Sequence, residues 1–235
     1  MRAILLAAGL GTRLRPITDS IPKCLVPINA KPLLEYWLDN LYEAGIREFL
    51  INTHYLHEQV EKYIENSKYK KFVTLVYEED LLLTGGTILT NKSFFKDESF
   101  MVIHADNLCF CDFKAFMQSH QDRQKDCVMT MMTFKSDNPQ SCGVVKLNSE
   151  NVVTEFYEKV KNPPTDLANG AVYIFEPEIF EILSSLNKKE IDLSTEILPK
   201  LTNKINSYLN DVYLKDIGTL KSYALSQIDV LKFTK

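Results

Sequence analysis

Residues 3 to 32 carry the most information about the fold of this chain, and they read AILLAAGLGTRLRPITDSIPKCLVPINAKP. Residues 3 to 8 form a continuous apolar run, which is typical of a short strand buried on both faces. Gly9 and Gly11 follow, and their lack of a side chain lets the backbone approach a ligand closely. Backbone amides of such a loop bind anions, and the fork-shaped cation Arg13 comes next. The order of strand, glycine loop and cation therefore indicates a phosphate-binding loop.

Two familiar glycine motifs do not fit this loop. A Walker loop needs lysine and then serine or threonine directly after its last glycine, but Gly11 is followed by Thr12. A dinucleotide fingerprint needs a third glycine where Leu14 stands. The glycines alone fit a plain strand-to-helix turn equally well. The movable cation Lys23 and the segment PKCLVP at 22–27 tip the balance toward a phosphate site.

Together, residues 9–18 and 22–27 resemble the signature of the sugar-1-phosphate nucleotidylyltransferases, G-x-G-T-R-L-x-P-x-T and then P-K-P-L-V-P. Cys24 departs from the proline that the family usually has there. With scattered further motifs, the resemblance extends to about residue 227. It implies an α/β fold with a Rossmann-like, mixed and mostly parallel sheet flanked by helices.

Hydrophobic periodicity along the chain fits this fold. The first half alternates helices with short buried strands, as parallel sheets require; the expected helices are 31–44 and 57–65, and the expected strands are 48–53, 72–77 and 100–103. Two alternating runs at 142–147 and 152–157 predict an antiparallel hairpin, and residues 206–213 are expected to form a last strand. The resemblance implies one domain over 1–235, with a nucleotide-binding half to about 110 and a sugar-binding half over about 111–227.

Composition excludes several classes of protein. The chain has 235 residues, of which 45% are hydrophobic, and its net charge of −4 comes from 27 basic and 31 acidic residues that are interspersed. There is no basic stripe to bind nucleic acid. No apolar run approaches the about 20 residues of a membrane span, and the start lacks a signal-peptide cleavage region. We predict a cytoplasmic protein without membrane partners, whose five cysteines are reduced thiols.

A second match to the family lies at 78–87, EEDLLLTGGT, after a predicted strand. Its glycine pair predicts a turn where the backbone approaches a flat ligand such as a nucleobase, although a loop with a helix beginning at Thr87 fits the same residues. The family's similar stretch borders the nucleotide. The resemblance implies these nucleotide-binding residues: Leu6, Ala7, Ala8, Gly9, Gly11, Thr12, Arg13, Glu79, Gly85 and Gly86.

Two aspartates are candidate metal ligands. Asp106 follows a buried strand, where open α/β sheets gather ligand groups, and Asp216 lies in a segment resembling the family's W-x-D-I-G, with Leu214 at the tryptophan position. Carboxylate oxygens suit Mg²⁺, and the resemblance implies that these two residues hold it. Without the family, Asp106 fits a helix N-cap and Asp216 an ordinary strand-end acid.

The sugar-binding half carries a third set of matches. Their order resembles that of the family's sugar-binding half, and the resemblance implies that the sugar phosphate is bound by Gly143, Glu158, Lys159 and Asn169. A carboxylate and an amide suit sugar hydroxyls, and a lysine suits a phosphate. On the sequence alone, an exposed Glu-Lys pair is more often a solvated surface feature.

The resemblance implies transfer of a nucleotidyl group from a nucleoside triphosphate to a sugar 1-phosphate, giving a nucleotide sugar and pyrophosphate. Arg13 and Lys23 are its implied catalytic residues. The segments GVV and IDLSTEILPKL favour GTP with mannose or heptose 1-phosphate, whereas Ala7-Ala8-Gly9 resembles uridylyltransferases such as those acting on N-acetylmuramate 1-phosphate. Two further functions stay open: a phosphocholine-type cytidylyltransferase, and a catalytically silent regulatory subunit that binds nucleotide sugars.

The region after Asp216 indicates which form of the family the chain resembles. The sequence stops soon after it, so we expect the short form of the family, without the hexapeptide-repeat β-helix of longer relatives. The last predicted helix has an apolar face formed by Leu220, Ala224, Ile228 and Leu231, which fits either the core or a homodimer contact.

Overall fold

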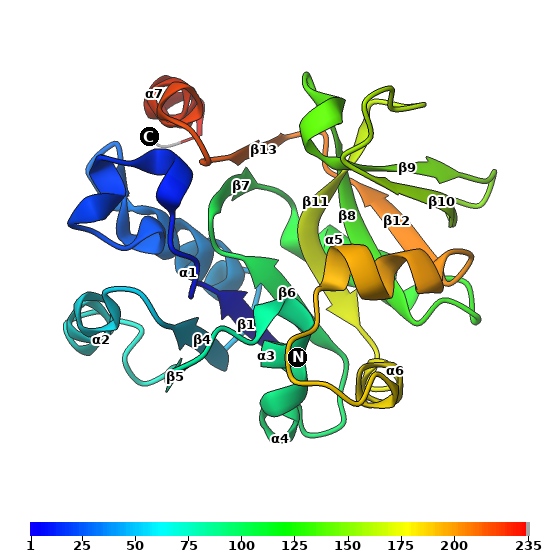
Figure 1. The fold of residues 1–235 in the computed structure, drawn as a ribbon, viewed down its shortest axis with the longest axis horizontal. Helices are drawn as coiled ribbons and strands as arrows, with labels where there is room; N and C mark the ends of the chain where they lie inside the picture. The colour runs from blue at the N-terminus through cyan, green and yellow to red at the C-terminus, as the bar shows by residue number, and fades with distance from the viewer. Residues whose placement is uncertain (234–235) are drawn as a thin grey trace. The chain divides into compact units, whose positions relative to one another are not determined.

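A computed structural model describes residues 1–233 of the chain (Figure 1). The chain separates into two compact units. The amino-terminal unit comprises residues 2–81, 103–113 and those from 212 onward, and the central unit comprises Met1, 82–102 and 114–211. The predicted division of one domain at about residue 110 stays a prediction.

A parallel sheet forms the centre of the amino-terminal unit. Its strands are β1 (Arg2–Leu6), β4 (Phe49–Thr53) and β5 (Val73–Tyr77), which lie side by side in Figure 1. Helix α1 (Leu33–Glu43) and helix α2 (His57–Glu65) connect them, and this confirms the predicted alternation. The buried side of α1 carries Leu34, Trp37, Leu38 and Leu41, which follow the helical period read from the sequence.

Short elements fill the long connection between β1 and α1. They are the 3-10 helices η1 (Thr12–Leu14), η2 (Ile17–Asp19) and η3 (Lys23–Leu25), and the antiparallel pair β2 (Pro27–Ile28) and β3 (Lys31–Pro32). The end of the chain returns to this unit as β13 (Tyr213–Asp216), α7 (Leu220–Asp229) and η7 (Val230–Lys232). Strand β13 pairs antiparallel with β7 (Asn107–Phe110).

The central unit is dominated by antiparallel strands. Its strands are β8 (Met129–Lys135), β9 (Gly143–Leu147), β10 (Val153–Glu158), β11 (Leu167–Phe175), β12 (Ile205–Leu209) and the first residues of β6 (Phe100–His104). β11 pairs antiparallel with β8 and β9, and β12 runs parallel to β8. β9 and β10 form the predicted hairpin.

The helices of the central unit are short. They are α3 (Leu83–Thr90), α4 (Lys92–Phe95), α5 (Phe113–Gln121), α6 (Ile179–Ser185), the 3-10 helices η4 (Pro139–Ser141) and η6 (Leu198–Leu201), and the π-helix η5 (Leu193–Ile197). Stacked rings hold α4 and α6 on the sheet, with centroids 4.0 Å apart for Phe95 and Phe100 and 5.3 Å apart for Phe100 and Phe180. Over residues 1–233, no helix is both long and apolar enough to cross a membrane.

One strand predicted from the sequence differs in the structure. We expected a strand over 206–213, but β12 ends at Leu209 and β13 begins only at Tyr213. The amide of Asn210 donates to the carbonyl oxygen of Thr133 at 2.8 Å, and the two residues after it are exposed. After this break the chain returns to the amino-terminal unit, in which β13 ends at Asp216.

Candidate functional site

Four charged side chains form a cluster in the amino-terminal unit. The Lys23 ammonium donates to Oδ2 of Asp106 at 2.8 Å and to Oδ1 of Asp216 at 3.3 Å. The Arg13 Nη2 atom lies 3.6 Å from Oδ2 of Asp216. The Lys23 side chain is only 9% exposed, whereas those of Asp106 and Asp216 are 41% and 50% exposed. The cluster therefore joins a buried cation to two carboxylates that solvent can reach.

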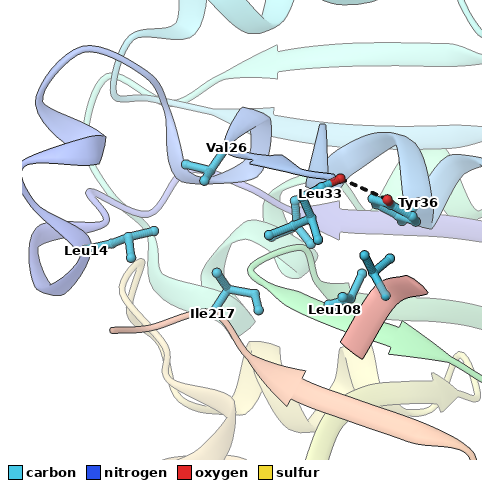
Figure 2. Close-up of a cluster of buried hydrophobic side chains, with 8 residues drawn as sticks. Leu14, Val26, Leu33, Tyr36, Leu108 and Ile217 are labelled. Carbon is cyan, nitrogen blue, oxygen red and sulfur yellow. Dashed lines mark hydrogen bonds between the residues drawn. The ribbon is translucent and has the colours of Figure 1, made fainter. Parts of the chain in front are cut away.

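A single hydrophobic core anchors all four charged residues. Leu14 follows Arg13, Ile217 follows Asp216, Val26 lies three positions after Lys23, and Leu108 lies two after Asp106; all four of these apolar side chains are fully buried. Figure 2 shows them gathered with Leu33 and Tyr36, whose hydroxyl donates to the carbonyl oxygen of Ile28 at 2.9 Å. Each such burial stabilises the fold by about 1.5–3 kcal/mol, so the segments carrying the charges are held firmly.

Backbone bonds bring the two aspartates together. Asp216 is opposite Asn107 in the β7–β13 ladder, and the amide of Ile217 donates to the carbonyl oxygen of Asp106 at 3.2 Å. The amide of Ala105 donates to the carbonyl oxygen of Leu6 at 3.1 Å. The segment that carries Asp106 thus lies beside the end of β1, where the glycine loop begins.

The cations of the cluster keep Asp106 ionised. The partial burial of Asp106 by itself would raise the pKa of its carboxyl group, but Lys23, His104 and Arg13 together hold that pKa below its ordinary value. Cys24 behaves in the opposite way, because burial raises the pKa of its thiol to about 12. Cys24 is therefore a packing residue of the loop, and its sulfur stays protonated at neutral pH.

The two loop glycines differ in what an added side chain would contact. Gly11 has φ +64°, and a Cβ there would lie 3.0 Å from Cγ2 of Thr18 and 3.2 Å from Cβ of Lys23. The Thr18 hydroxyl also donates to the carbonyl oxygen of Gly11 at 2.8 Å. By contrast, a Cβ on Gly9 would meet no described atom within 4 Å. The fold of the loop therefore requires a glycine at position 11, whereas no described atom near position 9 requires one there.

Asn52 and Glu78 support the start of the glycine loop, and the sequence analysis did not single them out for this role. The Ala7 amide donates to Oδ1 of Asn52 at 2.7 Å, and Nδ2 of Asn52 donates to Oε1 of Glu78 at 3.0 Å. Asn52 and Glu78 are both buried, whereas the predicted nucleotide-binding residue Glu79 is exposed. The only signal in the sequence was Asn52 itself, a polar residue directly after the three apolar residues that begin the strand FLINT.

The glycine pair of the second motif does not form the predicted turn. Gly85 and Gly86 lie inside helix α3, and the amide of Gly85 donates to the carbonyl oxygen of Ile191 at 2.7 Å. A Cβ on Gly86 would lie 2.1 Å from the carbonyl oxygen of Lys189. The turn prediction was wrong, because close packing of the helix on the 189–191 segment accounts for both glycines. Their nucleotide-binding role stays a prediction.

The predicted sugar-binding residues gather within the central unit. Gly143 is opposite Glu158 in the β9–β10 ladder, and a Cβ at Gly143 would lie 2.6 Å from Oε2 of Glu158. The Lys159 ammonium lies 3.1 Å from Oε1 of Glu158, and its side chain is 65% exposed. Asn169 is in β11, where Nδ2 donates to the Tyr173 hydroxyl at 2.7 Å.

The donor set at Asp106 and Asp216 fits a magnesium ion. In the part of the chain that the structure describes, no three His, Cys, Asp or Glu side chains are grouped so that they could hold a metal. Mg²⁺ needs fewer, because it binds through one or two carboxylates together with substrate phosphates and water. The two carboxylates already surround a cation here, since both contact the Lys23 ammonium.

Residues 2–232 match the family described as nucleotidyl transferase. The chain belongs to this family. Its members use a divalent metal ion, and their substrates are a nucleotide and a sugar phosphate. The resemblance drawn from the loop signature is thereby confirmed.

Three known proteins illustrate the similarity. The mannose-1-phosphate guanylyltransferase catalytic subunit beta of Drosophila pseudoobscura pseudoobscura is 32% identical over 228 residues, covering 94% of this chain and 60% of that protein. The UTP–glucose-1-phosphate uridylyltransferase of Synechocystis sp. is 30% identical over 240 residues, covering 95% and 61%. HddC from Yersinia pseudotuberculosis, solved in complex with GMP-PN, has a TM-score of 0.81 at 25% identity and 99% coverage of both chains.

These similarities concern the region that aligns. The chain spans about 60% of the length of the curated relatives named above. The solved structure has the same fold over 99% of this chain. The predicted class, an α/β fold with a mixed, mostly parallel sheet flanked by helices, is confirmed.

Proposed function

We propose that this family member transfers a nucleotidyl group from a nucleoside triphosphate to a sugar 1-phosphate and releases pyrophosphate. The observation that carries the proposal is the contact of Lys23 with Asp106 and Asp216 beside the glycine loop. GTP with mannose or heptose 1-phosphate is the favoured pair. The guanylyltransferase relative and the GMP-PN complex of HddC support this choice of base.

The proposed reaction needs alignment and charge neutralisation more than a base. The attacking sugar phosphate is already an anion, and pyrophosphate leaves from the α-phosphorus of the nucleotide. Lys23 neutralises charge on the α-phosphoryl group as it transfers, and Arg13 with the amides of the loop after β1 holds the leaving pyrophosphate. The space at Gly9 admits a phosphate group to the loop backbone.

In this proposal Asp106 and Asp216 hold Mg²⁺. A bound magnesium ion would neutralise phosphate charge and fix the orientation of the triphosphate. The chain supplies two half-exposed carboxylates, and the remaining ligands come from water and substrate.

The proposal places the sugar phosphate on the central unit. Lys159 is exposed and carries the charge that suits the phosphate, while the Glu158 carboxylate and the Asn169 amide suit sugar hydroxyls. Glu79, Gly85 and Gly86 are assigned to the nucleotide on the family pattern. A cytoplasmic location stays a prediction. So does a homodimer, for which the exposed Leu220, Leu225, Ile228 and Leu231 of the last helices offer an apolar face.

A second candidate is the transfer of a uridylyl group. The Ala7-Ala8-Gly9 sequence of the loop resembles uridylyltransferases, and the Synechocystis relative has nearly the same identity as the guanylyltransferase. The base and the sugar are therefore the first properties to measure.

The test is pyrophosphate release with Mg²⁺ from GTP, UTP, CTP or dTTP, each combined with mannose, heptose, glucose or N-acetylmuramate 1-phosphate. We expect GTP with mannose or heptose 1-phosphate to react fastest. Asp106→Asn should abolish the reaction, whereas Asp122→Asn, which removes the same charge from a carboxylate outside the site, should not. Absence of turnover with every pair, despite nucleotide binding, would replace the proposal with a regulatory role.

A further inference from the structure

We propose that Lys23 is the resident cation of the two-carboxylate site, and that metal enters this site only together with a nucleotide. The inference rests on the proposed function and concerns the form in which the site takes its metal. The Lys23 ammonium is within 2.8 Å of Asp106 and 3.3 Å of Asp216, so one cation already bridges both carboxylates.

The charges of the cluster cancel before any ligand binds. Asp106 and Asp216 carry two negative charges, and Lys23 and Arg13 carry two positive ones, with Arg13 3.6 Å from Asp216. A free divalent ion that joined this cluster would leave a net charge of about +2 within a few ångströms. Like charges at that spacing repel strongly near a protein surface, so free metal binds weakly.

Burial prevents Lys23 from moving out into water to make room. Its side chain is 9% exposed, and a Cβ added at Gly11 would lie only 3.2 Å from Cβ of Lys23, so the base of the side chain is closely packed. The ammonium needs another anion within reach before it gives up the carboxylates, because a buried charge without a partner is costly. The triphosphate of an arriving nucleotide is such an anion, and it brings enough negative charge for both the metal and Lys23.

The experiment is a titration with Mn²⁺ followed by electron paramagnetic resonance, in the absence of nucleotide. We expect Lys23→Met to bind Mn²⁺ at least about tenfold more tightly than wild type, because a competing positive charge is gone. Lys23→Arg keeps the charge and should bind as weakly as wild type. Lys31→Met is the matched control, since it removes one lysine charge that pairs with Asp39 in the same unit.

A non-hydrolysable GTP analogue should remove the difference in Mn²⁺ affinity between Lys23→Met and wild type. With the analogue, wild type should bind Mn²⁺ tightly and the advantage of Lys23→Met should disappear. Equal Mn²⁺ affinity of Lys23→Met and wild type without nucleotide would overturn the inference. If Lys23→Met does not fold, as judged by circular dichroism, Lys23→Gln takes its place with the same expected gain.

The inference and the proposed function fail in different ways. Pyrophosphate release with no change of Mn²⁺ affinity in Lys23→Met would remove the inference and keep the function. Tighter Mn²⁺ binding in that variant, with no turnover of any substrate pair by wild type, would keep the inference and remove the function.

Discussion

Asn52 holds the peptide at Ala7 in place, because its side-chain oxygen accepts a 2.7 Å hydrogen bond from the Ala7 amide. The other end of the same side chain donates to buried Glu78. The bridge therefore connects three neighbouring points: the end of β1, strand β4 and the residue after β5. It sets the direction in which the chain leaves β1 toward Gly9.

Replacing Asn52 tests this bridge. Asn52→Ala leaves the Ala7 amide and Glu78 without this partner in a buried place, and we expect a loss of about 1–3 kcal/mol in the free energy of unfolding. Nucleotide affinity should fall as well, since the loop loses its fixed start. Urea unfolding and a nucleotide titration measure the two effects. Asn66→Ala is the control, because Asn66 is exposed and bonds only locally to Lys62; equal losses in the two variants would refute the bridging role.

Alanine variants at Gly9 and Gly86 distinguish a glycine that lets a ligand approach the backbone from one that is needed for packing. Gly86→Ala should lower the free energy of unfolding by about 1–3 kcal/mol, because the added methyl would overlap the Lys189 carbonyl oxygen. Gly9→Ala should unfold like wild type, since nothing described lies within 4 Å of the new Cβ, yet bind nucleotide more weakly. Thermal unfolding and nucleotide titration distinguish them. Wild-type nucleotide affinity in Gly9→Ala would show that no ligand approaches there.

Removal of the Lys23 ammonium should lower the rate of reaction. Lys23→Ala loses the charge proposed to stabilise the transferring phosphoryl group, and we expect kcat to fall by about 10²- to 10³-fold. Pyrophosphate release gives the rate, and Lys31→Ala controls for the loss of a lysine at an ion pair elsewhere in the unit. A folded Lys23→Ala protein with full turnover contradicts the assignment.

His120 makes the stability of the central unit depend on pH. Burial, and after it the Arg123 charge, lower the pKa of His120 to about 4, against the opposing pull of Glu176. In the unfolded chain the pKa is about 6.5, so the unfolded state takes up its proton first as pH falls. The stability from neutral His120 is present above about pH 6.5 and is lost as pH falls toward 4, by at most about 3 kcal/mol.

Urea unfolding at pH 7.5 and pH 5 measures this loss. Neutral His120 is held between the Thr130 hydroxyl at 2.9 Å and the Glu176 carboxylate at 3.0 Å. His120→Gln offers polar groups that do not titrate, so its free energy of unfolding should fall less between the two pH values. An unchanged difference in that variant would assign the acid sensitivity to other groups.

Local periodicity predicted the parts of the fold that depend on nearby residues. Helix α2 has the predicted bounds, 57–65, since its apolar positions and its start are all written within that segment. The β9–β10 hairpin was also evident from alternating runs around a short turn. Lys23 and Arg13 could be proposed from the sequence because they belong to one continuous motif.

The remaining features depend on contacts between distant segments. The pairing of β7 with β13 places Asn107 opposite Asp216. No local sequence pattern predicts that two strands so far apart in the chain pair with each other. Asn52 was missed for the same reason, because its value lies in bonds to residues 7 and 78. The Gly85-Gly86 pair led to a wrong turn prediction, because the neighbouring sequence does not show that the helix packs on the distant 189–191 segment.

The pairing of β13 with β7 also sets when the site can exist. A ribosome adds about 5–20 residues per second, so Asp216 emerges roughly 10–40 seconds after the glycine loop. Until then the nascent chain carries Lys23 and Asp106 but lacks the second carboxylate that completes their cluster. The growing polypeptide thus cannot form the complete charged cluster before Asp216 has been added.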